Sequence, residues 1–129
     1  MKNEKEQRKG KNVLQLRSYG LSLQIINLLE TLPRNYIYQT LGKQLLRSAT
    51  SVGANIVEAQ AGRTRRDFTN FYHIALKSAN ETKYWLALLS EKTRETSNKQ
   101  KINLLLNEIT EISKMLGASL LTLKGKRSF

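Results

Sequence analysis

The sequence predicts an all-α protein that folds as an antiparallel, up-and-down four-helix bundle. Apolar residues recur three and four positions apart in four separate stretches of the 129-residue chain, which is the periodicity of one helix face. No segment alternates polar and apolar residues for long, as strands do. The connections between the four stretches are short, and short connections join antiparallel neighbours.

The first two helices are expected from about Gln15 to Thr31 and from about Ile37 to Ala61. Pro33 ends the first, because the residue before a proline avoids α-helical dihedrals. Gly62 is expected to cap the second with a positive φ. The apolar face of the first helix comprises Leu14, Leu21, Ile25, Leu28 and Leu32, widened by Leu23 and Ile26.

The third and fourth helices are expected from about Arg65 to Thr93 and from about Asn98 to Leu123. Thr64 is expected to cap the third, with Asp67 three residues later, and Ser97 with Gln100 fits a capping box for the fourth. Four aromatic residues share the apolar side of the third helix, where we expect core packing and not base stacking: Phe68, Phe71, Tyr72 and Trp85.

The composition excludes several kinds of site and of targeting segment. The chain has no cysteine, which excludes disulfides and thiolate metal sites. No apolar run approaches the ~20 residues that a membrane span needs, and the N-terminus lacks the apolar core of a secretory signal. We therefore expect a cytoplasmic protein with no membrane partner.

The formal net charge is +12, and a field this positive attracts polyanions. Residues 1–11 and 124–129 are rich in lysine and arginine and are expected to be disordered basic extensions of a bundle that spans residues 12–123. Roughly half of the excess charge lies on the bundle itself, where it can form a patch for nucleic acid.

The inventory of reactive residues argues against an enzyme. His73 is the only histidine, so neither a histidine metal site nor a di-iron site can be assembled, and no phosphate-binding glycine loop occurs. We expect no catalytic residue, metal or cofactor. One enzymatic alternative stays open: Arg66 and His73 share a helix face with a spacing that resembles that of HEPN-type ribonucleases.

Basic residues cluster around the second and third helices, which carry eight basic residues and three acidic ones between Arg34 and Lys83. Arginine can bind phosphate oxygens with both arms of its guanidinium, and phosphate contacts dominate sequence-independent affinity for nucleic acid. A solvated face that only keeps the protein soluble is the alternative. The candidate residues for binding RNA or DNA are Lys43, Arg47, Arg63, Arg65, Arg66 and Lys77.

The second helix is unusually rich in small residues, including a mid-helix glycine that costs about 1 kcal/mol relative to alanine. Small residues permit close approach of backbones, either inside the bundle or against another subunit. Polar residues within this segment should be hydrogen-bonded wherever they are buried. The candidate structural or subunit-contact residues are Ser51, Gly53, Ala54, Asn55 and Glu58.

The run QLLRSATSVGANIVEA from Gln44 to Ala59 resembles the signature of the bacterial four helix bundle protein family. That family includes proteins encoded in ribosomal-RNA intervening sequences and the accessory variability protein of retroelements. Asp67-Phe68, Ile74-Ala75 and the ETKYWL run from Glu81 to Leu86 match the pattern that follows. The resemblance implies a four-helix bundle that assembles into a homopentamer and has no catalytic residues. It also implies partners that include nucleic acid and a reverse transcriptase.

Two functions from different classes follow from these observations. The first is a non-enzymatic, homo-oligomeric basic scaffold that binds nucleic acid through its phosphates. The alternative is a protein-interaction module whose basic surface docks an acidic partner.

Overall fold

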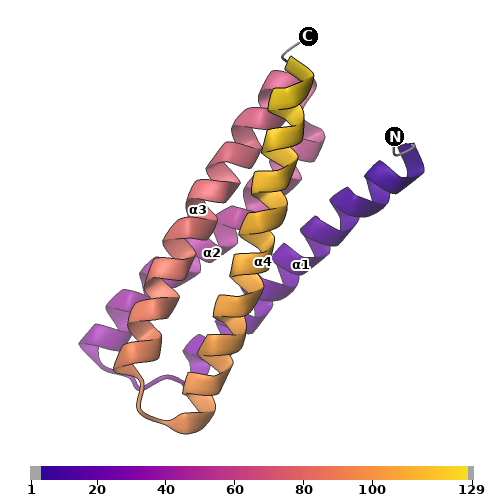
Figure 1. Cartoon of the computed structure of the whole chain (residues 1–129). Helices are drawn as coiled ribbons and strands as arrows, with labels where there is room; N and C mark the ends of the chain where they lie inside the picture. Colours follow the sequence, from indigo (N-terminus) through magenta and orange to yellow (C-terminus); the bar gives the residue numbers. More distant parts are fainter. Residues whose placement is uncertain (1–3, 128–129) are drawn as a thin grey trace.

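The computed structural model describes the backbone of residues 4–127 and the side chains of residues 13–125. It contains α1 (Glu4–Thr31), α2 (Tyr36–Ala61), α3 (Arg65–Lys92) and α4 (Thr96–Arg127), and no strand occurs in the part described (Figure 1). The predicted all-α, four-helix bundle is confirmed.

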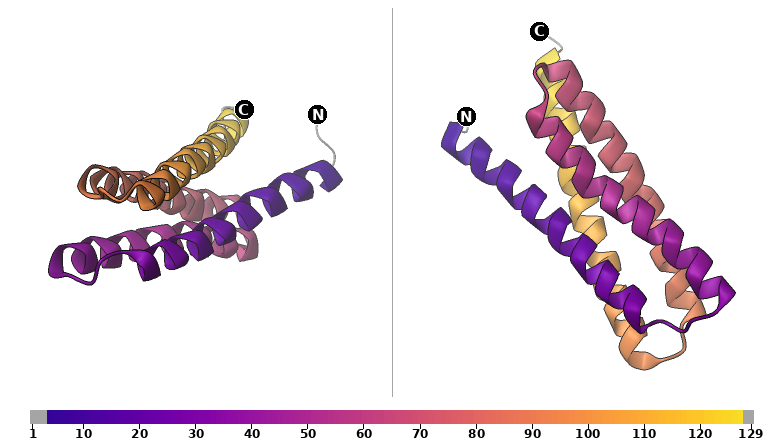
Figure 2. Two further views of the ribbon diagram at one scale, coloured as in Figure 1. Left: turned by 90° about the horizontal axis from the view of Figure 1, so that it is seen from below. Right: turned by 180° about the vertical axis from the view of Figure 1, so that it is seen from behind.

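The helices pack as neighbours around a square. α2 contacts α1 and α3, and α4 contacts α3 and α1, whereas the diagonal pairs do not touch. The α1–α2 and α3–α4 connections lie at one end of the bundle, and the α2–α3 connection lies at the other end, together with the start of α1 and the end of α4 (Figure 1). Toward its N-terminus α1 diverges from the other three helices (Figure 2).

The core is built from the predicted apolar faces. Leu21, Ile25 and Leu28 of α1 are fully buried, as are Leu45 and Ile56 of α2. The expected core position of the aromatic residues is also confirmed, since Tyr72 is buried and the others pack partly buried against the core: Phe68, Phe71 and Trp85.

Two residues assigned to the apolar face of α1 lie outside the core. Leu23 is 47% exposed and Ile26 is 38% exposed, so the prediction that they widen the buried face is wrong. At 3.6 residues per turn Leu23 is rotated about 200° from Leu21, which carries it to the far side of the helix. The first helix thus has two apolar faces, of which the bundle buries one.

The expected end of α1 before Pro33 and the expected Thr64 cap are confirmed, whereas two other expectations about capping are wrong. Thr64 caps α3, and its Oγ1 accepts from the Asp67 N–H at 3.0 Å. The expected Ser97 capping box is wrong, because the Glu95 carboxylate accepts the N–H groups of Ser97 and Asn98, at 2.9 and 2.8 Å.

Gly62 ends α2 with φ −63° and ψ 140°, so the expected positive φ is also wrong. A Cβ at Gly62 would lie 3.1 Å from the Ala59 carbonyl oxygen and 3.1 Å from the Asp67 Cβ. A side chain here would make tight contacts, so glycine favours the close passage of the chain into α3 and does not serve a left-handed conformation.

The helices continue into the segments expected as extensions. α1 begins at Glu4 and α4 reaches Arg127, which differs from the expectation of disorder in residues 1–11 and 124–129. The sequence there contains lysine, glutamate, glutamine and arginine, which are good helix formers, and no proline that would end a helix. Residues 1–3 and 128–129 lie outside the described residues, and the domain limits at 12 and 123 stay predictions.

The mid-helix glycine of α2 lies where α1 crosses it. A Cβ at Gly53 would lie 3.6 Å from the Cβ of Ser18 and 3.8 Å from the Ser18 carbonyl oxygen. Ser18 is fully buried, and its Oγ donates to the Leu14 carbonyl oxygen at 2.8 Å. This close approach of two backbones explains the small residue within the chain itself.

An ion pair that the sequence analysis did not single out joins α1 to α4. Arg17 donates from Nη2 to Glu108 Oε1 at 2.6 Å and from Nε to Glu108 Oε2 at 3.0 Å. The side chains are 35% and 29% exposed. The hydrogen bond from Arg17 lowers the pKa of the Glu108 carboxyl, and burial opposes this only in part.

The packing at Gly53 predicts opposite changes in stability for a small and a large substitution. Gly53→Ala adds a methyl group at ordinary van der Waals distance and gains helix propensity, so it should raise the free energy of unfolding by up to about 1 kcal/mol. Gly53→Leu should lower it by about 1–3 kcal/mol, because the side chain must displace α1. Urea unfolding followed by circular dichroism measures both. An alanine variant less stable than the leucine variant would contradict the packing.

The Arg17–Glu108 pair makes a prediction about pH. Because the pKa of Glu108 is lowered on folding, the pair stabilises the protein above the unfolded pKa of the carboxyl and stops doing so as pH falls through the folded value. Glu108→Gln should therefore cost up to about 1 kcal/mol near neutral pH and almost nothing in strong acid. The control is Glu91→Gln, at an exposed position of α3 whose carboxylate forms no salt bridge among the described residues. If Glu108→Gln lowers the free energy of unfolding equally at neutral pH and in strong acid, the ion pair is excluded as the cause.

Candidate nucleic-acid interface

The α2–α3 turn carries the densest group of predicted phosphate ligands. Arg63 lies in the turn, and Arg65 and Arg66 begin α3 directly after the Thr64 cap. All three are exposed, and no carboxylate among the described residues forms a salt bridge with any of them. The turn therefore presents three guanidinium groups to solvent, with Asp67 as the one acidic residue beside them in the sequence. We call Arg63, Arg65 and Arg66 the turn cluster.

A polar stripe continues the turn cluster along α3. Arg66, Asn70, His73 and Lys77 are exposed and follow one another at helical spacing. Lys77 lies eleven residues after Arg66, which corresponds to about 16 Å at 1.5 Å per residue. The structure thus brings Lys77 onto the same face as the turn cluster.

Arg47 differs from the other candidates because its charge is already matched. Its Nη2 donates to Glu81 Oε1 at 2.6 Å, and its Nε and Nη2 also donate to Gln44 Oε1 at 3.2 and 2.8 Å. The pair bridges α2 and α3 on the surface. Arg47 thus has a structural partner that its position in the sequence does not indicate.

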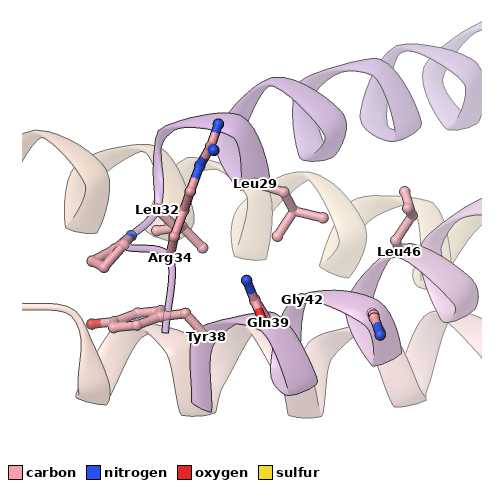
Figure 3. A pocket seen from close by; sticks show the side chains of 9 residues that line it. Leu29, Leu32, Arg34, Tyr38, Gln39, Gly42 and Leu46 are labelled. Atoms are coloured by element: carbon pink, nitrogen blue, oxygen red, sulfur yellow. The ribbon is translucent and has the colours of Figure 1, made fainter. Parts of the chain in front are cut away.

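Lys43 lies far from the turn cluster. It precedes Arg63 by 20 residues along α2, which corresponds to about 30 Å. Lys43 lines a pocket beside the α1–α2 connection, together with Leu29 of α1 and residues of the connection (Figure 3). The predicted set therefore divides between the two ends of the bundle.

The small and polar residues of α2 make contacts within the chain. Ser51 Oγ and Ser78 Oγ of α3 lie 2.9 Å apart, and Asn55 Nδ2 donates to the Ser51 carbonyl oxygen at 2.8 Å and to its Oγ at 3.0 Å. Asn55 is therefore partnered, as expected. Ala54 and Glu58 are exposed, so Glu58 does not need a buried partner.

The pair considered for a ribonuclease is exposed on α3. Arg66 and His73 are seven residues apart, about 10 Å along the helix, and no hydrogen bond joins them in the described part of the chain. His73 lines a groove between α3 and α4 that also contains Thr69 and Lys114. The described residues contain no group of three histidine, cysteine or carboxylate side chains placed to hold a metal ion.

The outer face of α1 is apolar and exposed. Its members share a helical spacing of three and four residues, and their exposed fractions are far above those of core residues: Leu16 69%, Tyr19 66%, Leu23 47% and Ile26 38%. We call these four residues the α1 outer stripe. A Cβ at Gly20, next to Tyr19, would meet no atom of the chain within 4 Å. Sequence periodicity could have revealed this second face, because its spacing is as regular as that of the first.

Taken together, the fold and the turn cluster define a small, basic, all-α bundle protein. The described helices contain no segment long and apolar enough to cross a membrane. The sequence model of the 23S rRNA-intervening sequence protein family matches residues 11–118. The chain belongs to this family, which confirms the resemblance carried by the run from Gln44 to Ala59.

A solved structure supports the same assignment. The chain is similar to a protein of unknown function from the S23 ribosomal protein family of Bacteroides thetaiotaomicron, with 38% sequence identity and a TM-score of 0.76. The match covers 86% of this chain and 97% of that one. No functionally curated protein matches the chain.

Proposed function

We propose that the protein is a non-enzymatic, homo-oligomeric scaffold that binds RNA or DNA mainly through phosphates. The observation that carries this proposal is the turn cluster, whose three exposed guanidinium groups have no salt-bridge partner among the described residues. Arginine holds phosphate through two parallel hydrogen bonds, so such a cluster favours a polyanion. The family's description refers to 23S rRNA, which makes RNA the first ligand to test.

The topology adds to the positive charge at this end of the bundle. The α2–α3 turn lies at the same end as the start of α1 and the last turns of α4 (Figure 1). The sequence carries further basic residues in those segments, among them Lys5, Arg8, Lys124 and Arg127. The positive charge of these segments adds to the electrostatic potential at this end of the bundle, which favours binding of a polyanion there.

The turn cluster makes a prediction about nucleic-acid affinity. Replacing Arg63, Arg65 and Arg66 by glutamine should weaken binding of RNA and DNA about equally for all sequences, and should reduce the slope of log affinity against log salt by about 2–3. Fluorescence anisotropy with a labelled RNA duplex at several salt concentrations measures both quantities.

The control removes the same charge from the opposite end of the bundle, by glutamine at the exposed positions Arg94, Lys99 and Lys101. It should retain most of the affinity. Equal losses in the two variants would mean that only net charge matters and would reject the turn cluster as the site. An acidic partner protein in place of nucleic acid would co-purify after nuclease treatment and lose its binding in the same triple variant.

The α1 outer stripe supports the homo-oligomeric part of the proposal. Two leucines, an isoleucine and a tyrosine form a continuous apolar seam on a helix that the rest of the chain covers on one side only. Exposed seams of this kind mark association surfaces. Gly20 adds room for a close approach, since no atom of the chain occupies the space beside it. We infer that copies of the chain associate through this face, as in the pentamer that the resemblance implies.

This association makes a prediction about mass in solution. Leu16→Glu combined with Leu23→Glu places two charges within the seam and should convert the oligomer to a monomer, with helix content unchanged. Light scattering coupled to size exclusion, after nuclease treatment, measures the mass. The control is Leu104→Glu on α4, which is 68% exposed and lies outside the stripe. A wild-type protein that is monomeric without nucleic acid would reject the interface.

A further inference from the structure

A pocket of about 530 Å³ lies where α1 turns into α2, at the opposite end of the bundle from the turn cluster (Figure 3). Its volume is within the usual range for small-molecule sites. The last turn of α1, the connection and the first three turns of α2 contribute its walls. The lining residues are Leu29, Leu32, Pro33, Arg34, Tyr38, Gln39, Gly42, Lys43 and Leu46.

One side of this α1–α2 pocket is apolar and held in place. Leu32 is buried and Leu29 and Leu46 are half-buried against the core. Tyr38 is half-buried, and its hydroxyl donates to the Lys92 carbonyl oxygen at 3.3 Å, which fixes the ring relative to α3. A Cβ at Gly42 would approach Leu29 Cδ2 to 3.1 Å, so the glycine leaves room for the leucine wall.

Two cationic residues also line the pocket, Arg34 from the connection and Lys43 from α2. Arg34 and Lys43 are exposed, and neither forms a salt bridge with a carboxylate in the part of the chain that the structure describes. No lining residue is acidic. Figure 3 shows the Gln39 amide directed toward the space between the two helices, with Arg34 on the α1 side and Tyr38 beside it. The amide offers both a donor and an acceptor at the centre of the site.

This combination of groups selects a particular ligand chemistry. A guanidinium and an ammonium group favour a phosphate, an aromatic ring and leucine side chains favour a flat apolar ring, and an amide can pair with the polar edge of a base. A nucleotide, whose sugar links a phosphate to a heteroaromatic base, satisfies all three. A duplex presents phosphates but keeps its bases stacked, so it satisfies only the first.

We propose that the α1–α2 pocket binds a single unpaired nucleotide, with its phosphate on Arg34 and Lys43 and its base against Tyr38 and the leucine wall. The proposal rests on the proposed nucleic-acid function and deepens it, because it adds a preference for unpaired nucleotides. The turn cluster by itself contacts only phosphates. A strand whose backbone contacts the turn cluster must span the length of α2, about 30 Å, to reach the pocket. The ligand is therefore either a nucleotide within a longer single strand or a free nucleotide.

The test compares single-stranded and duplex RNA of equal length, each binding to the wild type and to Arg34→Gln/Lys43→Gln. The double variant should lose about tenfold in affinity for the single strand and less than about twofold for the duplex. The matched control is Arg94→Gln/Lys99→Gln, which removes two exposed charges at the same end of the bundle and should leave the ratio of the two affinities unchanged. Circular dichroism verifies that each variant is folded.

Two further arms identify the ligand and its source. A single strand with abasic sites keeps its phosphates but lacks bases, so the wild type should bind it as weakly as the double variant binds the intact strand. If adenosine monophosphate competes with the single strand, the pocket is assigned to a free nucleotide. If it does not compete, and the double variant still loses affinity for the single strand, the pocket is assigned to a nucleotide within a strand.

The proposal is overturned if the abasic strand binds the wild type as tightly as the intact one, or if the double variant keeps its affinity for the single strand. Failure of the proposed phosphate-binding function is a different result, because duplex binding would then be absent from the wild type as well. Single-strand binding that depends on Tyr38→Ala but not on the two cations would also reject the phosphate assignment.

Discussion

The close packing of α2 against both of its neighbours is the constraint on which the rest of the bundle depends. Toward α3, Thr82 Oγ1 donates to Ser48 Oγ at 2.9 Å inside the interface, and toward α1 the backbone of Ser18 passes beside Gly53. Because these side chains are small, the helices approach closely enough for the leucine and isoleucine stripes to fill the space between them. Ser48 Oγ donates in turn to the Leu45 carbonyl oxygen at 3.2 Å, so both hydroxyls are hydrogen-bonded, which limits the cost of burying them.

This packing also determines where the charge of the protein can act. Small and apolar residues occupy the inner face of α2, so its charged residues lie outside. Arg47 is neutralised there by Glu81 across the α2–α3 boundary. The turn between the same two helices has no such partner for its arginines among the described residues. The side of the α2–α3 hairpin thus carries an ion pair within the chain, whereas the tip of the hairpin carries arginines that form a cationic surface. The opposite end combines two cations with an apolar wall, so the two poles differ in the chemistry that they offer to a ligand.

Much of the architecture could be predicted from the pattern of residues. Particular positions show where prediction from the sequence was wrong or impossible. The buried stripes of all four helices and the Thr64 cap follow from local rules, because helical spacing and a side-chain cap involve residues within one or two turns. The Ser97 cap was wrong because the Glu95 carboxylate accepts the same N–H groups. Gly62 does cap α2 as expected, but with a negative φ, and the approach of Asp67 favours the glycine there. Of the candidate site, the turn cluster is contiguous in the sequence and was identifiable. The pocket residue Arg34 was not, because α1 and α2 must fold together before its surroundings exist.

The amino-acid pattern alone was sufficient for the helices, their order and the family, since periodicity and signature residues are properties of single segments. The tertiary structure decided which basic side chains remain available, which apolar face of α1 is covered, and that Arg17 binds Glu108 across 91 residues of chain. The physical reason is that a helix determines by its own spacing which residues share a face, whereas burial, pairing and neutralisation depend on the segments that happen to pack against that face.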